Sequence, residues 1–225
     1  MNKTARRTFL TQAIGVGCTA ALPFPAITSA QQASPPANTT PGSALFPHMK
    51  WFNEPASAKQ SGEQLAVVTR PKTDFWRKTF YGYTTNNGHF LYLPVSGDFT
   101  LQAKVSGQYK DHYDQAGLMA RIDDSNWLKC GLELVDGIGH ASVVVTREYS
   151  DWSTVRGITT KSPVWWRLVR KGASLEVLYS LDGNAYTSLR LGYLPPQTAL
   201  DIGVMCASPE EQGFTATFEE LRLTR

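Results

Sequence analysis

Apolar and polar residues alternate along short segments of this chain, and this period of two constrains the fold more than any other feature. Between residues 126 and 134, for example, Leu128, Cys130 and Leu132 point to one side of an extended backbone. No segment keeps the spacing of an amphipathic helix for long. The sequence therefore predicts an all-β protein.

The alternating segments are separated by residues that favour turns, such as Asp136-Gly137 and Asp182-Gly183. Their number exceeds what one twisted sheet usually holds, so we expect two antiparallel sheets packed face to face as a sandwich. The predicted strands are residues 49–53, 64–69, 76–83, 89–94, 99–106, 115–122, 126–134, 141–148, 164–171, 174–180, 199–207 and 214–223.

The N-terminus carries a twin arginine, Arg6-Arg7, followed by a mostly apolar stretch and then by small residues up to Ala30. This order is typical of a Tat export signal with a signal peptidase site, so residues 1–30 are predicted to be removed. An uncleaved anchor is the alternative, but the stretch contains Pro23 and Pro25 and lacks the ~20 unbroken apolar residues of a membrane span. We therefore expect a periplasmic or secreted protein with no membrane association after signal removal.

The segment 31–47 is rich in Pro, Ser, Thr, Asn and Ala and has no apolar period, so it is predicted to be a disordered linker. Residues 48–225 then form one domain, large enough to bury a substantial core. The net charge of +3 equals the contribution of Lys3, Arg6 and Arg7 in the predicted signal. A mature domain near neutrality disfavours a nucleic-acid partner, which needs a basic surface.

Two cysteines, Cys130 and Cys206, remain after the predicted signal, and both lie at inward-facing strand positions. A disulfide between them is possible in an oxidising compartment. Because Tat substrates fold in the reducing cytoplasm before export, we expect buried, unpaired thiols instead.

The strands predicted at residues 115–122 and 126–134 each carry polar residues on the side opposite their apolar face. Gln115 and Arg121 share one side of the first strand, and Trp127, Lys129 and Glu133 share one side of the second. Together they predict a polar and aromatic surface. The alternative is an ordinary solvated sheet face, in which Glu133 and Lys129 form a surface ion pair.

Several short motifs occur in an order and spacing that resemble a known family. They are Thr73-Asp74-Phe75-Trp76-Arg77, Gly88-His89-Phe90, Gly97-Asp98-Phe99, Tyr113-Asp114-Gln115-Ala116-Gly117-Leu118-Met119, Trp127-Leu128-Lys129, Ser142-Val143-Val144-Val145-Thr146 and Tyr179-Ser180-Leu181-Asp182-Gly183. Residues 49–223 thereby resemble the regulation-of-enolase family of concanavalin A-like domains. The resemblance implies a jelly-roll sandwich with a concave sheet, and it implies much less about function.

Signs of catalysis are weak in this sequence. Glycoside hydrolysis needs two carboxyl groups across the scissile bond, and the E-x-D-x-x-E motif of concanavalin A-like glucanases is absent. The histidines have no nucleophile motif such as G-x-S-x-G. No His or Cys pair has zinc-ligand spacing, and Asp123-Asp124-Ser125-Asn126 is predicted to be a tight hairpin turn. No cofactor is expected, although a structural calcium ion remains possible.

A non-catalytic binding site for a carbohydrate or other small polar ligand, on the concave sheet, is therefore the predicted function. Saccharide sites combine aromatic rings, which cover the apolar faces of sugars, with side chains that bond to hydroxyls. A hydrolase with an unrecognised carboxylate pair and a protein-interaction module are the alternatives. The predicted ligand-binding residues are Trp76, His89, Asp114, Gln115, Arg121, Trp127, Lys129, Glu133 and Trp152.

Overall fold

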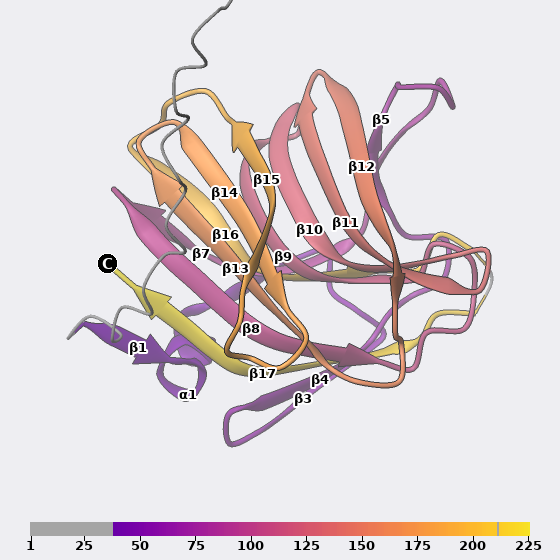
Figure 1. Cartoon of the computed structure of the whole chain (residues 1–225), viewed down its shortest axis with the longest axis horizontal. Coiled ribbons are helices and arrows are strands. Elements are labelled where there is room, and N and C mark those ends of the chain that lie inside the picture. Colours follow the sequence, from indigo (N-terminus) through magenta and orange to yellow (C-terminus); the bar gives the residue numbers. More distant parts are fainter. Residues whose placement is uncertain (1–37, 211) are drawn as a thin grey trace, which may run out of the picture. The chain divides into compact units, whose positions relative to one another are not determined.

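Two large antiparallel sheets make up most of the computed structural model, which describes residues 38–210 and 212–225 (Figure 1). The back sheet contains, in spatial order, β15 (Thr187–Tyr193), β14 (Ser174–Ser180), β13 (Val164–Lys171), β8 (Phe99–Gly107), β17 (Thr215–Thr224), β4 (Gln64–Val68) and β3 (Ser57–Ser61), and β1 (Thr39–Pro41) also pairs with β17. The front sheet contains β12 (Tyr149–Ile158), β11 (Ile138–Arg147), β10 (Asn126–Val135), β9 (Gln115–Asp123), β16 (Ala199–Ala207), β7 (His89–Ser96) and β2 (Lys50–Phe52). The predicted all-β jelly-roll sandwich of two antiparallel sheets is confirmed.

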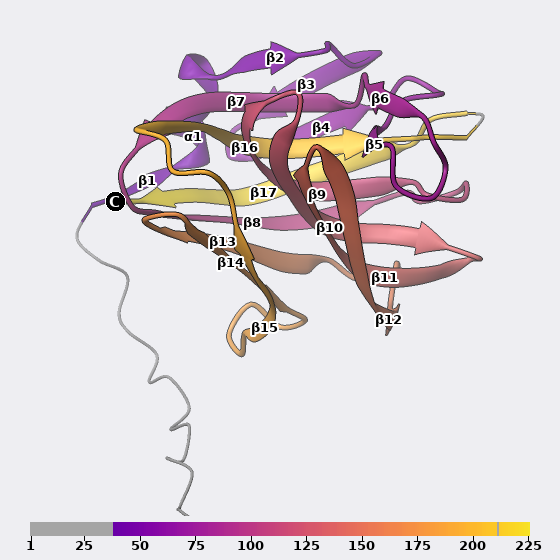
Figure 2. The same ribbon diagram turned by 90° about the horizontal axis from the view of Figure 1, so that it is seen from above.

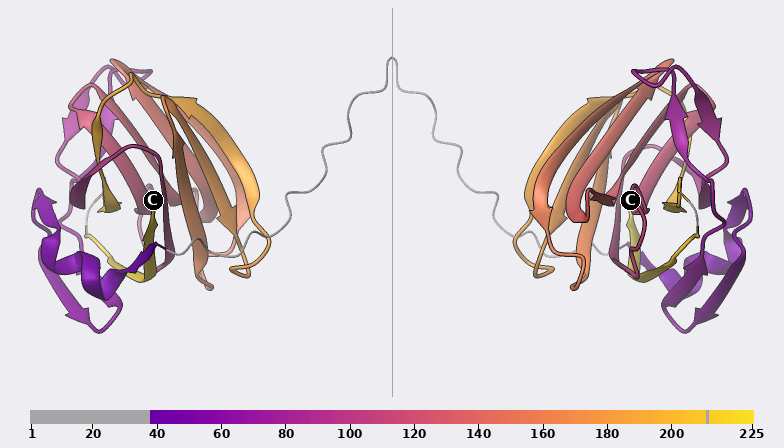
Figure 3. Two further views of the ribbon diagram at one scale, coloured as in Figure 1. Left: turned by 90° about the vertical axis from the view of Figure 1, so that its left-hand side faces the viewer. Right: turned by 90° about the vertical axis from the view of Figure 1, so that its right-hand side faces the viewer.

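The main core lies between the two sheets, whose strands are strongly curved (Figure 3). Leu118 of β9 and Leu128 of β10 are fully buried there, together with Leu168 of the back sheet. Leu128, Cys130 and Leu132 all belong to this cluster, so the predicted direction of their side chains is confirmed.

Both described cysteines, Cys130 and Cys206, are buried and unpaired, as predicted. Loss of water around the thiol raises the pKa of Cys130 to about 12, so it remains a neutral thiol at any ordinary pH. The two residues act as small apolar side chains of the core.

The outer face of the front sheet, which points away from the back sheet, carries a second apolar cluster. Its members are Phe75, Trp76, Phe90, Met119, Trp127, Val144 and Met205. Phe75 and Trp76 come from a segment that crosses this face, residues 74–86, which contains β5 (Phe75–Arg77) and β6 (Thr84–Asn86) and is called the cover segment below (Figure 2). Much of the outer face is therefore buried under the cover segment.

The cover segment corrects one predicted strand. Residues 76–83 do not form a continuous strand, because β5 ends at Arg77 and the chain then turns. Lys78 and Phe80 adopt φ angles of 60° and 61°, which lie in the left-handed region and are incompatible with a strand. The aromatic residues of this turn favoured a strand in the prediction, but they pack over the outer face of the front sheet instead.

Five strands were absent from the prediction, and the longest three are β3, β12 and β15. These three lie at sheet edges and are mostly exposed. The sequences of β3 and β12 lack the apolar alternation of buried strands, whereas β15 has it at Leu189, Leu191 and Tyr193. The hairpin predicted at 123–126 is confirmed, since β9 ends at Asp123 and β10 begins at Asn126.

The predicted disordered linker is wrong for its described part. Thr39–Pro41 form β1, and α1 (Gly42–Leu45) and η1 (Phe46–His48) follow. Leu45 and Phe46 are buried against the main core, so the domain begins before residue 48. Two apolar side chains were enough to anchor a segment whose composition is otherwise polar. The rest of the predicted linker lies outside the described residues.

Candidate functional site

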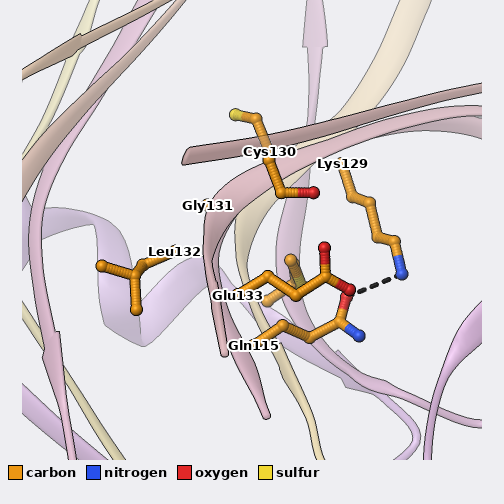
Figure 4. A pocket seen from close by; sticks show the side chains of 8 residues that line it. Gln115, Lys129, Cys130, Gly131, Leu132 and Glu133 are labelled. Carbon is orange, nitrogen blue, oxygen red and sulfur yellow. Dashed lines mark hydrogen bonds between the residues drawn. The ribbon is translucent and has the colours of Figure 1, made fainter. Parts of the chain in front are cut away.

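A small pocket opens on the outer face of the front sheet, above the point where β9 and β10 approach most closely. Gly131 of β10 lies opposite Gly117 of β9 at this point. A methyl group added to Gly131 would lie 2.2 Å from the carbonyl oxygen of Ala116, so only glycine allows this approach. Gln115, Lys129 and Glu133 surround the space above the glycines (Figure 4).

Lys129 lies at the centre of the polar wall of this pocket and is almost completely buried. Its ammonium group donates hydrogen bonds to Gln115 Oε1 at 2.6 Å and to Asp74 Oδ1 at 3.1 Å. Asp74 comes from the cover segment, immediately before β5. The buried charge of Lys129 is therefore balanced by a carboxylate from a distant part of the chain.

Gln115 joins the same network from β9. Its amide nitrogen donates to Asp74 Oδ1 at 3.2 Å and to the carbonyl oxygen of Tyr113 at 3.2 Å. Asp74 Oδ1 also accepts a bond from the backbone N–H of Phe75 at 2.7 Å. The network fixes the cover segment to both β9 and β10.

Glu133 is the second carboxylate of the pocket and is only 6% exposed. The indole N–H of Trp152 donates to Glu133 Oε2 at 3.0 Å and to Ser142 Oγ at 2.9 Å. Burial is the main influence on Glu133 and raises its pKa. Asp74 raises this pKa further, whereas Lys129, Ser142 and Trp152 oppose the change.

Aromatic rings form the other walls and the rim. Trp76, Tyr81, Tyr83, Tyr113 and Trp152 line an adjoining pocket with an enclosed volume of about 30 Å³ and an open mouth, together with Asp74, Gln115, Lys129, Glu133 and Val144. Trp76 and Tyr81 meet nearly at right angles at 5.6 Å, and Tyr113 and Trp152 do so at 6.3 Å. The hydroxyl groups of Tyr81 and Tyr113 lie 3.1 Å apart and close one side.

The structure places five of the nine predicted binding residues in this pocket. They are Trp76, Gln115, Lys129, Glu133 and Trp152. The alternative surface ion pair between Glu133 and Lys129 does not describe the arrangement, because both side chains are buried and Lys129 bonds to Asp74.

Trp127 was predicted to be the stacking platform and must be corrected. It points to the outer face as expected, but its ring is buried among Phe75, Met119 and Val144 and is only 1% exposed. Phe75 of the cover segment contacts it edge to face, at 6.2 Å between ring centroids. Trp127 therefore supports the wall behind the pocket, and no ring face is left for a ligand.

His89 and Asp114 were also predicted to bind ligand, but both are buried in structural hydrogen bonds. His89 Nε2 accepts a bond from the backbone N–H of Arg70 at 2.9 Å, and Nδ1 lies 2.9 Å from the carbonyl oxygen of Asn53. Burial lowers the pKa of His89, in agreement with a neutral ring. Asp114 accepts bonds from Ser208 Oγ at 2.6 Å and from the backbone N–H groups of 110 and 111 at 2.9 and 3.0 Å.

Arg121 is the fourth predicted residue that lies outside the pocket. It occupies the far end of β9, where it pairs with Asp124 and lies over the ring of Phe52 at 4.4 Å. An open depression beside it is lined by the hairpin at 123–126 and by Glu148.

Within residues 38–210 and 212–225, no cluster of three or more His, Cys, Asp or Glu side chains is arranged to hold a metal ion.

Five polar or aromatic pocket residues were missed by the sequence prediction: Asp74, Tyr81, Tyr83, Tyr113 and Ser142. Asp74 and Tyr113 lie within motifs that carried the family resemblance, but nothing in the local sequence indicated that they meet Lys129 and Glu133. Tyr81 and Tyr83 flank Gly82 in the turn, and such an aromatic turn is the one signal that pointed to a ligand site.

Comparisons with known proteins show where this chain belongs. Residues 51–225 match the family model described as "Protein of unknown function (DUF1349)". "Regulation of enolase protein 1" of Saccharomyces cerevisiae is 40% identical over 174 residues, which cover 77% of this chain and 88% of the yeast protein. A crystal structure of a functionally unknown protein from the same yeast has a TM-score of 0.77 and 39% identity, and it covers 80% of this chain and 97% of that chain.

More distant structures share only the fold. Xylan β-1,4-xylosidase from Bacillus halodurans C-125 gives a TM-score of 0.58 at 10% identity and covers 80% of this chain and 39% of that chain. A carbohydrate-binding module from Bacillus subtilis gives a TM-score of 0.51 at 10% identity and covers 77% and 95% of the two chains.

The yeast relative corrects the predicted location. The 40% identical relative is a yeast protein named for the regulation of enolase, and this finding contradicts Tat export. The predicted Tat export, and with it the periplasmic or secreted location, is therefore wrong. The twin arginine Arg6-Arg7 and the predicted signal peptide at 1–30 lie outside the described residues. No helix in the described part of the chain is long and apolar enough to cross a membrane.

Proposed function

From the premise that this chain belongs to the DUF1349 family, we propose that its pocket on the outer face of the front sheet binds a carbohydrate or similar small polar ligand without catalysis. The family description assigns no function, so the proposal rests on the pocket itself. Its enclosed volume is only about 30 Å³, far below the ~300–1,000 Å³ of drug-sized sites, so a ligand would bind mainly across its open, aromatic-lined mouth.

One observation carries this proposal: aromatic rings and buried charged groups line the same pocket. Trp152 is 36% exposed and forms one wall, and its indole N–H is already bonded to Glu133. The ring face remains available for the apolar side of a sugar. Lys129 and Glu133 lie close beside it and offer partners for hydroxyl groups.

Strong preorganisation favours binding at this position. Lys129, Gln115 and Asp74 hold one another in a network that includes three elements of the chain. A ligand would meet side chains that need little ordering, which lowers the entropic cost of binding. The shared fold with a carbohydrate-binding module and with part of a xylosidase agrees with a saccharide ligand.

A hydrolase is the second candidate, and one finding favours it. The pocket contains two carboxyl groups, Asp74 and Glu133, and burial raises the pKa of Glu133 as in a general acid. Asp74 Oδ1, however, is engaged by Lys129, Gln115 and the backbone of Phe75. This engagement is typical of a structural counter-ion and argues against a free nucleophile.

The proposal is tested by a glycan array on the purified chain, followed by titration of each hit by calorimetry. Trp152→Ala should weaken binding about tenfold or more, because the stacking contact is lost. Trp165→Ala is the matched control, since Trp165 lies on the back sheet and bonds to Glu220. Equal binding by the wild type and Trp152→Ala would contradict the proposed site.

Turnover separates the two candidates. Incubation of each hit with the wild type should leave it intact. Cleavage by the wild type that disappears in Glu133→Gln would overturn the binding proposal in favour of the hydrolase, because the substitution keeps the shape but removes the ionisable carboxyl group.

A further inference from the structure

Most amide, indole and ammonium donors of the pocket's polar wall already bond to protein acceptors. Both N–H groups of the Gln115 amide are used by Asp74 Oδ1 and the Tyr113 carbonyl. The single indole N–H of Trp152 is shared by Glu133 and Ser142. Lys129 directs two of its three N–H groups to Gln115 and Asp74.

The two carboxyl groups retain acceptor capacity. Three donors reach Asp74 Oδ1, but among the described residues no hydrogen bond reaches Asp74 Oδ2. Trp152 bonds to Glu133 Oε2 and Ser142 also bonds to this carboxyl group, so Glu133 keeps only part of its acceptor capacity. A ligand group that donates hydrogen bonds therefore matches this pocket better than one that accepts them.

The charges of the pocket point in the same direction. Lys129 is the one cationic side chain among the described residues that line it, and Asp74 lies 3.1 Å away as its counter-ion. Among the described residues Glu133 forms no direct ion pair, and only the more distant charge of Lys129 stabilises its carboxylate. When Glu133 is ionised, two carboxylates face one ammonium group, and one negative charge is left in a buried site.

The aromatic rings provide the remaining requirement. Five aromatic side chains line the pocket, and two pairs of them meet at 74° and 77°, so ring faces and edges form adjacent walls. The negative faces of Trp and Tyr rings attract cations, and cages of such rings with a carboxylate suit ammonium groups.

We propose that the pocket selects ligands that carry an ammonium group, and that an amino sugar with Glu133 as its counter-ion is the preferred class. This inference rests on the proposed saccharide site and adds the charge of the ligand. An acidic sugar is disfavoured because its carboxylate would face Asp74 and Glu133. A neutral sugar stacks equally well but leaves the charge of Glu133 uncompensated.

Binding is then coupled to the protonation of Glu133. Because burial favours the neutral carboxyl group, the empty pocket holds a proton on Glu133 over a wider pH range than water would allow. An entering ammonium group replaces this proton, which leaves to solvent. The other titratable and charged groups around Glu133 are Asp74, Lys129, Tyr81, Tyr83 and Tyr113, with His140 opposite on β11 and Arg156 beyond it on β12.

These neighbours do not obscure the effect. Burial and Arg156 lower the pKa of His140, which favours its neutral ring, and Asp136 only partly opposes this shift. Burial and the bond to Tyr81 raise the pKa of Tyr113, so its hydroxyl group keeps its proton. Glu133 is therefore the group that changes its protonation state when the ligand binds.

The test compares glucosamine, N-acetylglucosamine, glucose and glucuronate by calorimetry. We expect glucosamine to bind at least about tenfold more tightly than glucose, and glucuronate to bind weakest. N-acetylglucosamine has no ammonium charge and should lose the advantage. Glu133→Gln should bring glucosamine and glucose to equal affinity, whereas Glu176→Gln on the back sheet should leave the preference unchanged.

A second probe separates this inference from the saccharide site. Tetramethylammonium carries a charge that does not titrate, so its affinity should fall as the pH is lowered and Glu133 takes up its proton, and should be independent of pH in Glu133→Gln. Equal binding of glucosamine and glucose would overturn the inference while the saccharide site stands. Binding of tetramethylammonium with no binding of any sugar would overturn the saccharide site and support the ammonium cage. No binding of any probe would overturn both.

Discussion

The two faces of strand β10 show how differently a core and a binding site are encoded. Toward the back sheet, Leu128, Cys130 and Leu132 enter one continuous apolar cluster. On the outer face, Trp127 is buried under the cover segment, whereas Lys129 and Glu133 line the pocket. The inner face needs only apolar residues at every second position, but the outer face depends on side chains that arrive from residues 74–86. The inner face of β10 therefore follows from its local sequence, whereas the outer face depends on contacts with a distant segment.

The largest effect on stability is expected when the buried ring of Trp127 is removed from the outer face. Trp127→Ala should lower the free energy of unfolding by about 3–5 kcal/mol, because it leaves a cavity beneath Phe75 and Val144. Denaturant unfolding measures this loss. A decrease below about 1 kcal/mol would mean that the cover segment does not hold the ring in a packed cluster.

The inner face is tested by Leu132→Ala, for which we expect a loss of about 2–5 kcal/mol in the same measurement. Leu191→Ala is the matched control, because Leu191 is 71% exposed on β15 and should change stability by no more than about 0.5 kcal/mol. Similar losses for the two leucines would contradict the assignment of Leu132 to the core.

The fold was predictable because its main determinants are local. Alternation at Leu118 and Leu128 set the direction of the side chains, and turn residues such as Asp136-Gly137 separated the strands. The edge strands were missed since exposed positions such as those of β3 need no apolar pattern. β1 and the buried Phe46 were missed because their partners lie in β17 and the main core, far along the chain.

The site was predictable only in part, and the reason is visible at Lys129. The alternation of side chains along β10 placed Lys129 and Glu133 on one face, and the structure confirms this placement. The partner of Lys129, however, is Asp74, which lies 55 positions earlier in the sequence. Trp127 was mistaken for an exposed ring. The alternation of side chains along a strand shows which face a residue points to, but it does not show whether another segment covers that face.

The glycine pair beneath the pocket offers a smaller test. Gly131→Ala should cost about 1–3 kcal/mol, because the new methyl group would approach the backbone of Ala116 and push β9 and β10 apart. The same variant should weaken ligand binding, since Gln115 and Glu133 stand on the two strands that separate. Unchanged stability would show that the close approach of the strands is not required.

The smallest expected effect is a dependence of the free energy of unfolding on pH, caused by Glu133. This effect distinguishes the polar part of the outer face from its apolar part. Because burial raises the pKa of Glu133, the folded state holds its proton more tightly than the unfolded state does. This contribution is fully present below the unfolded pKa of about 4.3 and is lost as the pH rises through the folded pKa. The carboxylate of Glu133 is then charged in a buried site, where the indole N–H of Trp152 donates a hydrogen bond to it.

Glu133→Gln should therefore be more stable relative to the wild type at neutral pH than at pH 4 and below, as measured by urea unfolding across the pH range. Glu176→Gln, which replaces a carboxylate on the back sheet that accepts a bond from Ser188, is the matched control for the loss of a carboxyl group. The Trp127→Ala difference should be independent of pH, because no ionisable group is lost. If the Glu133→Gln difference were constant with pH, the pKa of Glu133 would be the same in the folded and unfolded states, and burial would not raise it. The outer face would then differ from the inner face in shape alone and not in its buried charge.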